Sequence, residues 1–199
     1  MGYADVYNSW KSDPETFWIE AAQAIDWDCP PSFALDASRA PLYEWYTDSL
    51  VNTCYNAVDR HVENGRAAQI ALIYDSPITG AKDFITFQQL RDKTALLAGA
   101  LLAKGVTKGD RVIIYMPMVP QAVIAMLACA RIGAIHSVVF GGFAANELAV
   151  RIDDAEPKAI LAASCGIEPG RIIAYKPLID EAIEIAQHKP ETVLILQRE

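Results

Sequence analysis

The chain has 199 residues with a formal net charge of −8, and 52% of its residues are hydrophobic. This composition is typical of a globular protein that can build a sizeable core, and it excludes a disordered or fibrous chain. The acidic balance argues against binding of nucleic acid phosphates without regard to sequence.

The first part of the chain, residues 1–66, carries most of the negative charge and all four tryptophans. Apolar residues recur at helical spacing in residues 14–25 and again in residues 50–62. This pattern predicts an acidic, mostly helical cap held together by aromatic side chains. The second helix would place three polar residues on one face, and we interpret that face as a structural hydrogen-bond network rather than a catalytic one: Asn52, Asn56 and Asp59.

Two β-prone runs follow at residues 70–74 and 83–87. Turn-forming residues separate them at 76–80, so the two runs predict a hairpin. Gly80 and Lys82 give this turn a superficial likeness to a phosphate-binding loop. That interpretation is disfavoured because a P-loop opens a helix, whereas here the next segment is another strand.

The remainder of the chain alternates regularly between helical and strand patterns. Helices are expected at 88–104, 120–132, 144–155 and 177–188, and strands at 111–116, 135–140, 158–164 and 192–197. Apolar strands separated by helices predict βαβ units in a parallel sheet that is covered on both faces. The expected fold class is therefore α/β, a partial doubly wound parallel sheet with flanking helices at residues 67–199. Such sheets usually continue past a last strand like this one, so we expect the chain to be the front portion of a longer polypeptide.

One stretch, residues 112–130, is uncharged and long enough to cross a bilayer. Pro117 and Pro120 interrupt it, so we interpret it as a buried strand, a turn and a helix, and expect no contact with a membrane.

The four cysteines form no C-x-x-C pair, which argues against a zinc site or a disulfide scaffold. The chain also begins without the basic residues and the following apolar run of a secretory signal peptide. These features predict a cytoplasmic protein that holds no metal ion.

Ligands of open parallel sheets bind beyond the carboxyl ends of the strands. The loop after the expected strand 135–140 begins with Phe140, Gly141 and Gly142. Two glycines let a ligand approach the backbone close to a helix N-terminus, which suits a phosphate or a nucleotide. A Gly-Gly turn can also simply make a tight connection. The loop lacks the Gly-x-Gly-x-x-Gly pattern, which disfavours a dinucleotide-dependent oxidoreductase.

The loop after the next expected strand holds Glu168 and Arg171. If strands that are neighbours in sequence are also neighbours in the sheet, this loop lies near Gly141 and Gly142. Arg171 would offer planar, permanently charged donors to a phosphate monoester. It could equally be a surface residue paired with Glu168, in an exposed ion pair worth less than about 1 kcal/mol. The residues themselves leave both interpretations open.

Three longer runs resemble the acetyl- and propionyl-CoA synthetase branch of the adenylate-forming enzymes, at residues 109–118, 126–143 and 151–154. The resemblance extends to aromatic and polar residues of the first part, so it covers essentially the whole chain. Residues 162–171 are more similar to propionyl-CoA synthetases than to acetyl-CoA synthetases. Propionate is therefore the expected acid, with acetate as the alternative.

The resemblance implies a ligase reaction in two steps. Propionate attacks ATP to give an acyl-adenylate and pyrophosphate, and CoA then displaces AMP. ATP and CoA are thus implied substrates, and Mg²⁺ is expected with ATP but not bound by this segment. The family's phosphate loop, ribose-binding aspartate, hinge and adenylation lysine have no match here. We therefore expect no catalytic residue in this chain, which alone should be inactive and would need the rest of its polypeptide as a partner.

The resemblance implies that this chain forms one wall of the CoA nucleotide site. It implies that Phe140 packs against the CoA adenine, that Gly141 and Gly142 allow close approach, and that Arg171 meets the 3′-phosphate. Glu168 stands where the family has another arginine, which reverses the charge at that position. A rival hypothesis is a stand-alone, non-catalytic nucleotide-binding module. An uncovered sheet edge could also let the chain associate with itself.

Overall fold

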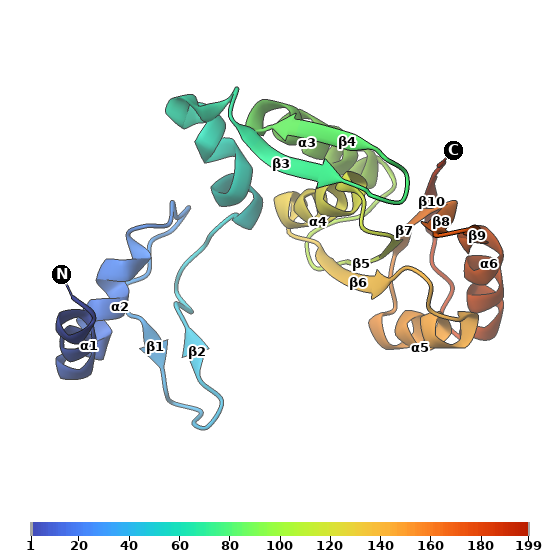
Figure 1. Ribbon diagram of the computed structural model, residues 1–199. Helices are drawn as coiled ribbons and strands as arrows, with labels where there is room; N and C mark the ends of the chain where they lie inside the picture. Colours follow the sequence, from blue (N-terminus) through green and yellow to red (C-terminus); the bar gives the residue numbers. More distant parts are fainter. Residues whose placement is uncertain (1, 199) are drawn as a thin grey trace. The chain divides into compact units, whose positions relative to one another are not determined.

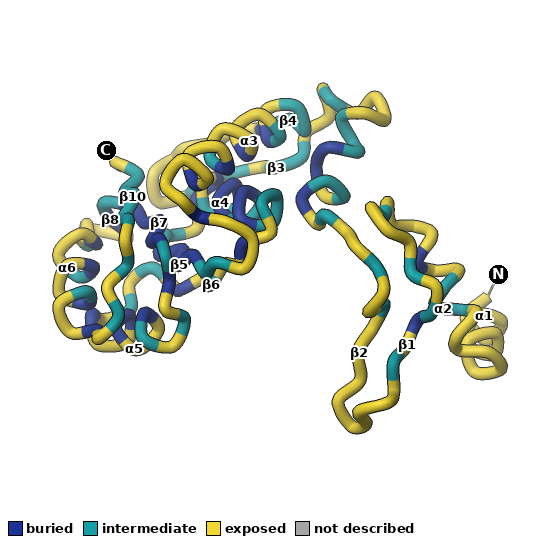
Figure 2. The backbone as a smooth tube through the Cα atoms, turned by 180° about the vertical axis from the view of Figure 1, so that it is seen from behind, coloured by how far each residue is buried: buried dark blue, intermediate teal, exposed yellow. Residues whose placement is uncertain are grey.

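The structure is a computed structural model that describes residues 2–198. The chain forms two compact units, one up to Asn52 and one from Thr53 onward (Figure 1). Buried backbone is concentrated in the second unit (Figure 2). In the described part of the first unit the buried hydrophobic residues are Ala22 and Ala34 alone. The main core, and with it the framework for a binding site, therefore belongs to the second unit.

The first unit consists of two helices and a short antiparallel hairpin, namely α1 (Tyr3–Ser12), α2 (Pro14–Ala22), β1 (Leu35–Asp36) and β2 (Glu44–Trp45). The start of α2 is fixed by Asp13, whose side chain accepts a hydrogen bond of 3.1 Å from the backbone N–H of Thr16. The Trp18 and Trp45 rings meet edge to face, with centroids 5.5 Å apart. The expected helical, aromatic-rich cap is confirmed, although α1 and the hairpin lie outside the predicted elements.

The helix expected at residues 50–62 begins later than predicted and includes two π-helices, η1 (Tyr55–Asp59) and η2 (Val62–Arg66). Both lie in the second unit, where they contact α3 (Phe87–Ala103). The division into compact units therefore does not coincide with the change in composition at residue 66.

The polar face of this helix is tied to the core by a buried ion pair. Oδ2 of Asp59 accepts a hydrogen bond of 2.6 Å from Nη2 of Arg131, and only 9% of Asp59 is exposed. One turn away, Nη1 of Arg60 donates to Oδ1 of Asn56 at 2.8 Å. These contacts join protein groups to one another, as a structural network does, whereas Asn52, which was expected on the same face, lies before the helix begins.

The predicted hairpin is present as β3 (Ile70–Asp75) and β4 (Lys82–Thr86), which pair antiparallel. The turn between them leads into a strand, as expected, and not into a helix. Helix α3 follows directly, and it begins at a capping box in which Thr86 and Gln89 satisfy each other's backbone N–H groups.

Four parallel strands form the sheet of the second unit, in the order β10-β7-β5-β6. They are β5 (Arg111–Met116), β6 (Ile135–Phe140), β7 (Ala159–Ala163) and β10 (Thr192–Leu196). Helix α4 (Pro120–Ile132) connects β5 to β6, α5 (Ala145–Ala155) connects β6 to β7, and α6 (Tyr175–Ile185) precedes β10.

The central strand β5 shows how helices cover both faces of this sheet. Ile113 and Tyr115 belong to the cluster that includes residues of α5 and α6, whereas Val112 and Ile114 belong to the cluster that includes residues of α3 and α4. This alternation follows from the two-residue period of a strand. A parallel sheet with helices on both faces confirms the predicted α/β, doubly wound class.

Two features of the sheet differ from expectation. Strand β6 lies at an edge, and its Ile135 and Val138 are exposed, so the sheet is not covered on both faces at this end. A further hairpin, β8 (Cys165–Glu168) with β9 (Arg171–Ala174), stands between β7 and α6 where a loop was expected. Helix α6 consequently begins at Tyr175, before its expected start.

Within residues 2–198 no helix combines the length and the apolar character needed to cross a bilayer. The uncharged stretch at residues 112–130 is divided between β5 and α4, as predicted.

Cys129 lies in α4 with its side chain fully buried, and burial raises the pKa of its thiol to about 11. Since the thiolate is the reactive form, we expect iodoacetamide at about pH 8 to leave Cys129 unmodified in the folded protein. Cys29 is exposed and serves as the internal control that should react. Peptide mass spectrometry before and after unfolding measures both, and equal labelling of the two thiols in the native protein would contradict this account.

Candidate functional site

The turn from β6 into α5 presents the first group of candidate residues. Phe140 ends β6 with 69% of its surface exposed, and its ring lies edge to face with that of Phe143, at 5.8 Å between centroids. Gly142 has a φ of +124°, a conformation that side chains with a Cβ rarely adopt. Glycine therefore suits the backbone conformation of this turn. The turn places the exposed ring of Phe140 beside an open stretch of backbone.

Gly141 is required for a different reason, which is space. A Cβ atom at this position would lie 2.8 Å from the Tyr175 hydroxyl and 2.9 Å from the backbone carbonyl atoms of Met116. Backbone atoms cannot move aside as the end of a flexible side chain can. The Gly-Gly turn is thus fitted closely against both β5 and the start of α6.

We expect Gly141→Ala to lower the free energy of unfolding by about 1–3 kcal/mol, the usual cost of overpacking. Gly99→Ala is the matched control, because a Cβ at Gly99 in α3 would meet no atom within 4 Å. That change should be neutral or slightly stabilising, since alanine favours a helix. Urea unfolding of both variants measures the difference. Equal free energies of unfolding would show that the contacts at Gly141 leave room for a Cβ atom.

The second group of candidate residues lies at the tip of the β8–β9 hairpin. Glu168 and Arg171 face each other in the strand register, and Oε2 of Glu168 accepts from Nε of Arg171 at 2.7 Å and from Nη2 at 2.6 Å. Both side chains are exposed, at 46% and 69%. The ion pair foreseen as one of two interpretations is therefore present, and it leaves the guanidinium accessible to solvent.

The strand order differs from the one that we used to predict that the hairpin lies near the glycine turn. The prediction assumed that β6 and β7 are neighbours, and this was wrong, because β5 lies between them in the sheet. The chain crosses back over β5 to form β7, an arrangement that is not encoded in any local pattern. The topological switch point, where ligands of such sheets commonly bind, consequently lies between β5 and β7.

Tyr175 is the residue that links the two groups. Its hydroxyl lies against both Gly141 and Gly166, and a Cβ at Gly166 would be only 2.3 Å from it. Its ring packs on that of Tyr115, with centroids 5.0 Å apart. Burial raises the pKa of both phenols. Tyr115 lies in the run 109–118 that carries the family resemblance, but nothing in the sequence gives either tyrosine a role, so the roles of this pair could be found only from the fold.

The structure does not bring Phe140 and Arg171 into contact. A cavity of about 240 Å³ beyond the end of β5 is lined by the turn after β3, by Met118, by Ile167 of the hairpin and by Arg198, but by neither Phe140 nor Arg171. This cavity therefore does not join the two predicted groups, which are connected through the tyrosine pair. A ligand that touched both would have to lie across the surface between them.

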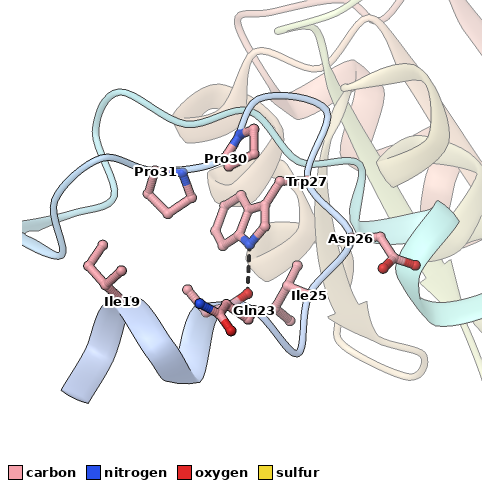
Figure 3. A pocket seen from close by; sticks show the side chains of 8 residues that line it. Ile19, Gln23, Ile25, Asp26, Trp27, Pro30 and Pro31 are labelled. Atoms are coloured by element: carbon pink, nitrogen blue, oxygen red, sulfur yellow. Dashed lines mark hydrogen bonds between the residues drawn. The ribbon is translucent and has the colours of Figure 1, made fainter. Parts of the chain in front are cut away.

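The first unit has a cavity of its own, of about 490 Å³, next to the end of α2 (Figure 3). Trp27 stands in it between the prolines Pro30 and Pro31 and the end of α2, and its indole N–H donates to the backbone carbonyl of Ala22 at 2.8 Å. The lining is mostly apolar and carries no cationic side chain. This cavity therefore offers no positively charged partner to a phosphate.

Within residues 2–198 no group of three or more His, Cys, Asp or Glu side chains is arranged to hold a metal ion.

Two family models match consecutive parts of the chain. The model of the AMP-binding enzyme family matches residues 58–199, and that of the acetyl-coenzyme A synthetase N-terminus matches residues 3–57. The chain is 54% identical over 94% of its length to acyl-CoA synthetase short-chain family member 3, mitochondrial, of Bos taurus. It is 48% identical over its full length to a propionate–CoA ligase of Salmonella typhimurium.

The chain spans only part of these relatives, 27% of the bovine protein and 31% of the Salmonella protein. A protein of Pseudomonas aeruginosa is 56% identical, with 30% of its length covered. The family match nevertheless extends over most of the chain and includes the sheet, the glycine turn and the hairpin. The chain therefore belongs to the AMP-binding enzyme family.

Proposed function

We propose that this chain is the N-terminal portion of a short-chain acyl-CoA synthetase, which joins propionate to CoA with the conversion of ATP to AMP and pyrophosphate through an acyl-adenylate. The observation that carries the proposal is the 48% identity over the full chain to a propionate–CoA ligase. The match of residues 3–57 to an acetyl-coenzyme A synthetase N-terminus supports its place in the polypeptide. It also makes acetate the alternative substrate.

The local contribution of this chain would be to bind the nucleotide end of CoA. Phe140 is exposed and free to pack against an adenine ring, as base–aromatic contacts require. Gly142 leaves the backbone open beside it, whereas the side of Gly141 that lacks a Cβ packs against Tyr175 and Met116. Arg171 carries an accessible guanidinium that can approach a phosphate with several donors at once.

The ion pair between Glu168 and Arg171 must separate before Arg171 can bind a phosphate. The Glu168 carboxylate already accepts two hydrogen bonds from Arg171, and it would repel an incoming phosphate. Because the pair is exposed, separating it costs less than about 1 kcal/mol. Arg171 can therefore exchange this partner for a phosphate, with Glu168 turning toward solvent.

The chemistry of acid activation would come from residues beyond this chain. None of the candidate residues is a nucleophile or a proton donor placed at an acyl or phosphoryl group. We propose that Mg²⁺ enters with ATP as part of the substrate and that residues of this chain do not hold it. The four unpaired cysteines support a reducing compartment, which we propose to be the cytoplasm.

The experiment that tests this function uses the full-length polypeptide encoded by the gene. Pyrophosphate release from ATP is measured with acetate, propionate and butyrate, and acyl-CoA formation is measured after CoA is added. We expect propionate to give the highest kcat/KM. A preference for acetate would favour the acetyl-CoA synthetase alternative, and nucleotide binding without turnover of any acid would favour a non-catalytic module.

A further inference from the structure

Tyr115 braces the glycine turn from inside the core. It lies on the central strand β5, one residue before the strand ends, and it is fully buried. The register pairs Met116 with Phe140, so β5 and β6 end side by side and the Tyr115 ring extends past them. Its hydroxyl donates to the carbonyl oxygen of Phe143 at 2.8 Å and accepts from the N–H of Gly142 at 3.2 Å.

The turn from Phe140 to Phe143 is closed by a backbone hydrogen bond of 3.2 Å from the Phe143 N–H to the Phe140 carbonyl, and Gly141 packs against Tyr175 and Met116. The Gly142 N–H and the Phe143 carbonyl, by contrast, are both bonded to the Tyr115 hydroxyl. This one hydroxyl therefore helps to fix two further backbone groups of the turn.

Tyr175 is a natural comparison, because it is packed against Tyr115 but acts differently. It is 2% exposed, and its hydroxyl fills the space between Gly141 and Gly166. Within residues 2–198 this hydroxyl makes no hydrogen bond. The two rings thus share one environment, while only the hydroxyl of Tyr115 is bonded to the turn.

We propose that Tyr115 is a positioning residue for CoA, whose hydroxyl holds the turn from Phe140 to Phe143 in the shape that presents an aromatic face and open backbone to the nucleotide. The inference rests on the proposed function and adds a residue that does not itself touch the ligand. Removal of the hydroxyl leaves the ring in place but frees the Gly142 N–H and the Phe143 carbonyl. The turn then samples other conformations, and binding of CoA must first restore the productive one.

The test compares Tyr115→Phe with Tyr46→Phe in the full-length enzyme. We expect Tyr115→Phe to raise the KM for CoA about fivefold or more, as loss of a buried hydrogen bond does. The propionate-dependent exchange of pyrophosphate into ATP, which does not require CoA, should keep its rate. Tyr46→Phe removes a hydroxyl that donates to the Trp18 carbonyl in the first unit at 3.0 Å, and it should leave both quantities within about twofold of the wild type, because this bond does not hold the glycine turn.

The outcomes separate this inference from the function on which it rests. A wild-type enzyme that forms no acyl-CoA would overturn both. An active wild type with an unchanged KM for CoA in Tyr115→Phe would overturn the positioning role alone, as would an equal rise in Tyr46→Phe or a matching loss in the exchange reaction. Hydrogen exchange gives a readout independent of turnover, since protection of the Gly142 amide should fall in Tyr115→Phe and persist in Tyr46→Phe.

Discussion

Replacing Arg171 by alanine in the full-length enzyme is expected to raise the KM for CoA about tenfold or more. A hydrogen bond to a charged group contributes roughly 1.5–3 kcal/mol, and about 1.4 kcal/mol corresponds to a factor of ten. Arg171 is 69% exposed at the hairpin tip, so it can reach a phosphate without displacing any core residue. Initial rates at varied CoA give the KM, and the adenylation half-reaction should be unchanged.

Two further variants make this result specific. Lys176→Ala removes another exposed cation from the same region, one that is paired with Asp180 in α6, and it should leave the KM for CoA unchanged. Glu168→Gln removes the carboxylate that competes for Arg171 and should lower the KM for CoA. A rise with Glu168→Gln, or no change with Arg171→Ala, would remove the hairpin tip from the CoA site.

Replacing Asp59 by alanine is expected to lower the free energy of unfolding by about 3–5 kcal/mol. Asp59 is buried and bonds Arg131 at 2.6 Å, and Arg131 is itself largely covered, with 25% of its side chain exposed. Removal of one partner leaves the other charge without compensation in a poorly solvated place. This cost is much larger than the stabilisation that the intact pair provides.

The matched control for Asp59→Ala is an exposed ion pair of the same unit. Lys82 and Asp75 lie 3.0 Å apart, with more than half of each side chain exposed. Lys82→Ala should therefore cost less than about 1 kcal/mol. Urea unfolding of both variants gives the comparison, and similar losses in the two would contradict a structural role for the buried network.

The sheet could be predicted in detail where local signals are strong. The bounds of β5, α4 and β6 agree with those expected from the sequence, because apolar runs are interrupted there by residues with a definite effect. Pro120 starts α4 at its first turn, and Gly133 ends it in a left-handed conformation. Such signals act within a few residues, and they do not depend on the rest of the fold.

The arrangement of the candidate site was harder to predict, for a physical reason. Strand order depends on how the chain crosses the sheet, so the position of β5 between β6 and β7 could not be derived from any single segment. Strands β8 and β9 are short and joined by a tight turn, which makes them resemble a loop. The tyrosine pair was missed because its hydrogen bonds and ring contacts join residues that are far apart in the chain.

The most direct test of the central claim compares CoA with dephospho-CoA, which lacks the 3′-phosphate. The KM of the wild-type enzyme for CoA should be lower than its KM for dephospho-CoA by about tenfold or more, since only CoA carries the 3′-phosphate that Arg171 is proposed to bind. In Arg171→Ala the two KM values should become nearly equal, mainly because the KM for CoA rises. If the variant discriminates between the two thiols as strongly as the wild type does, the 3′-phosphate is bound elsewhere and this assignment of the site is wrong.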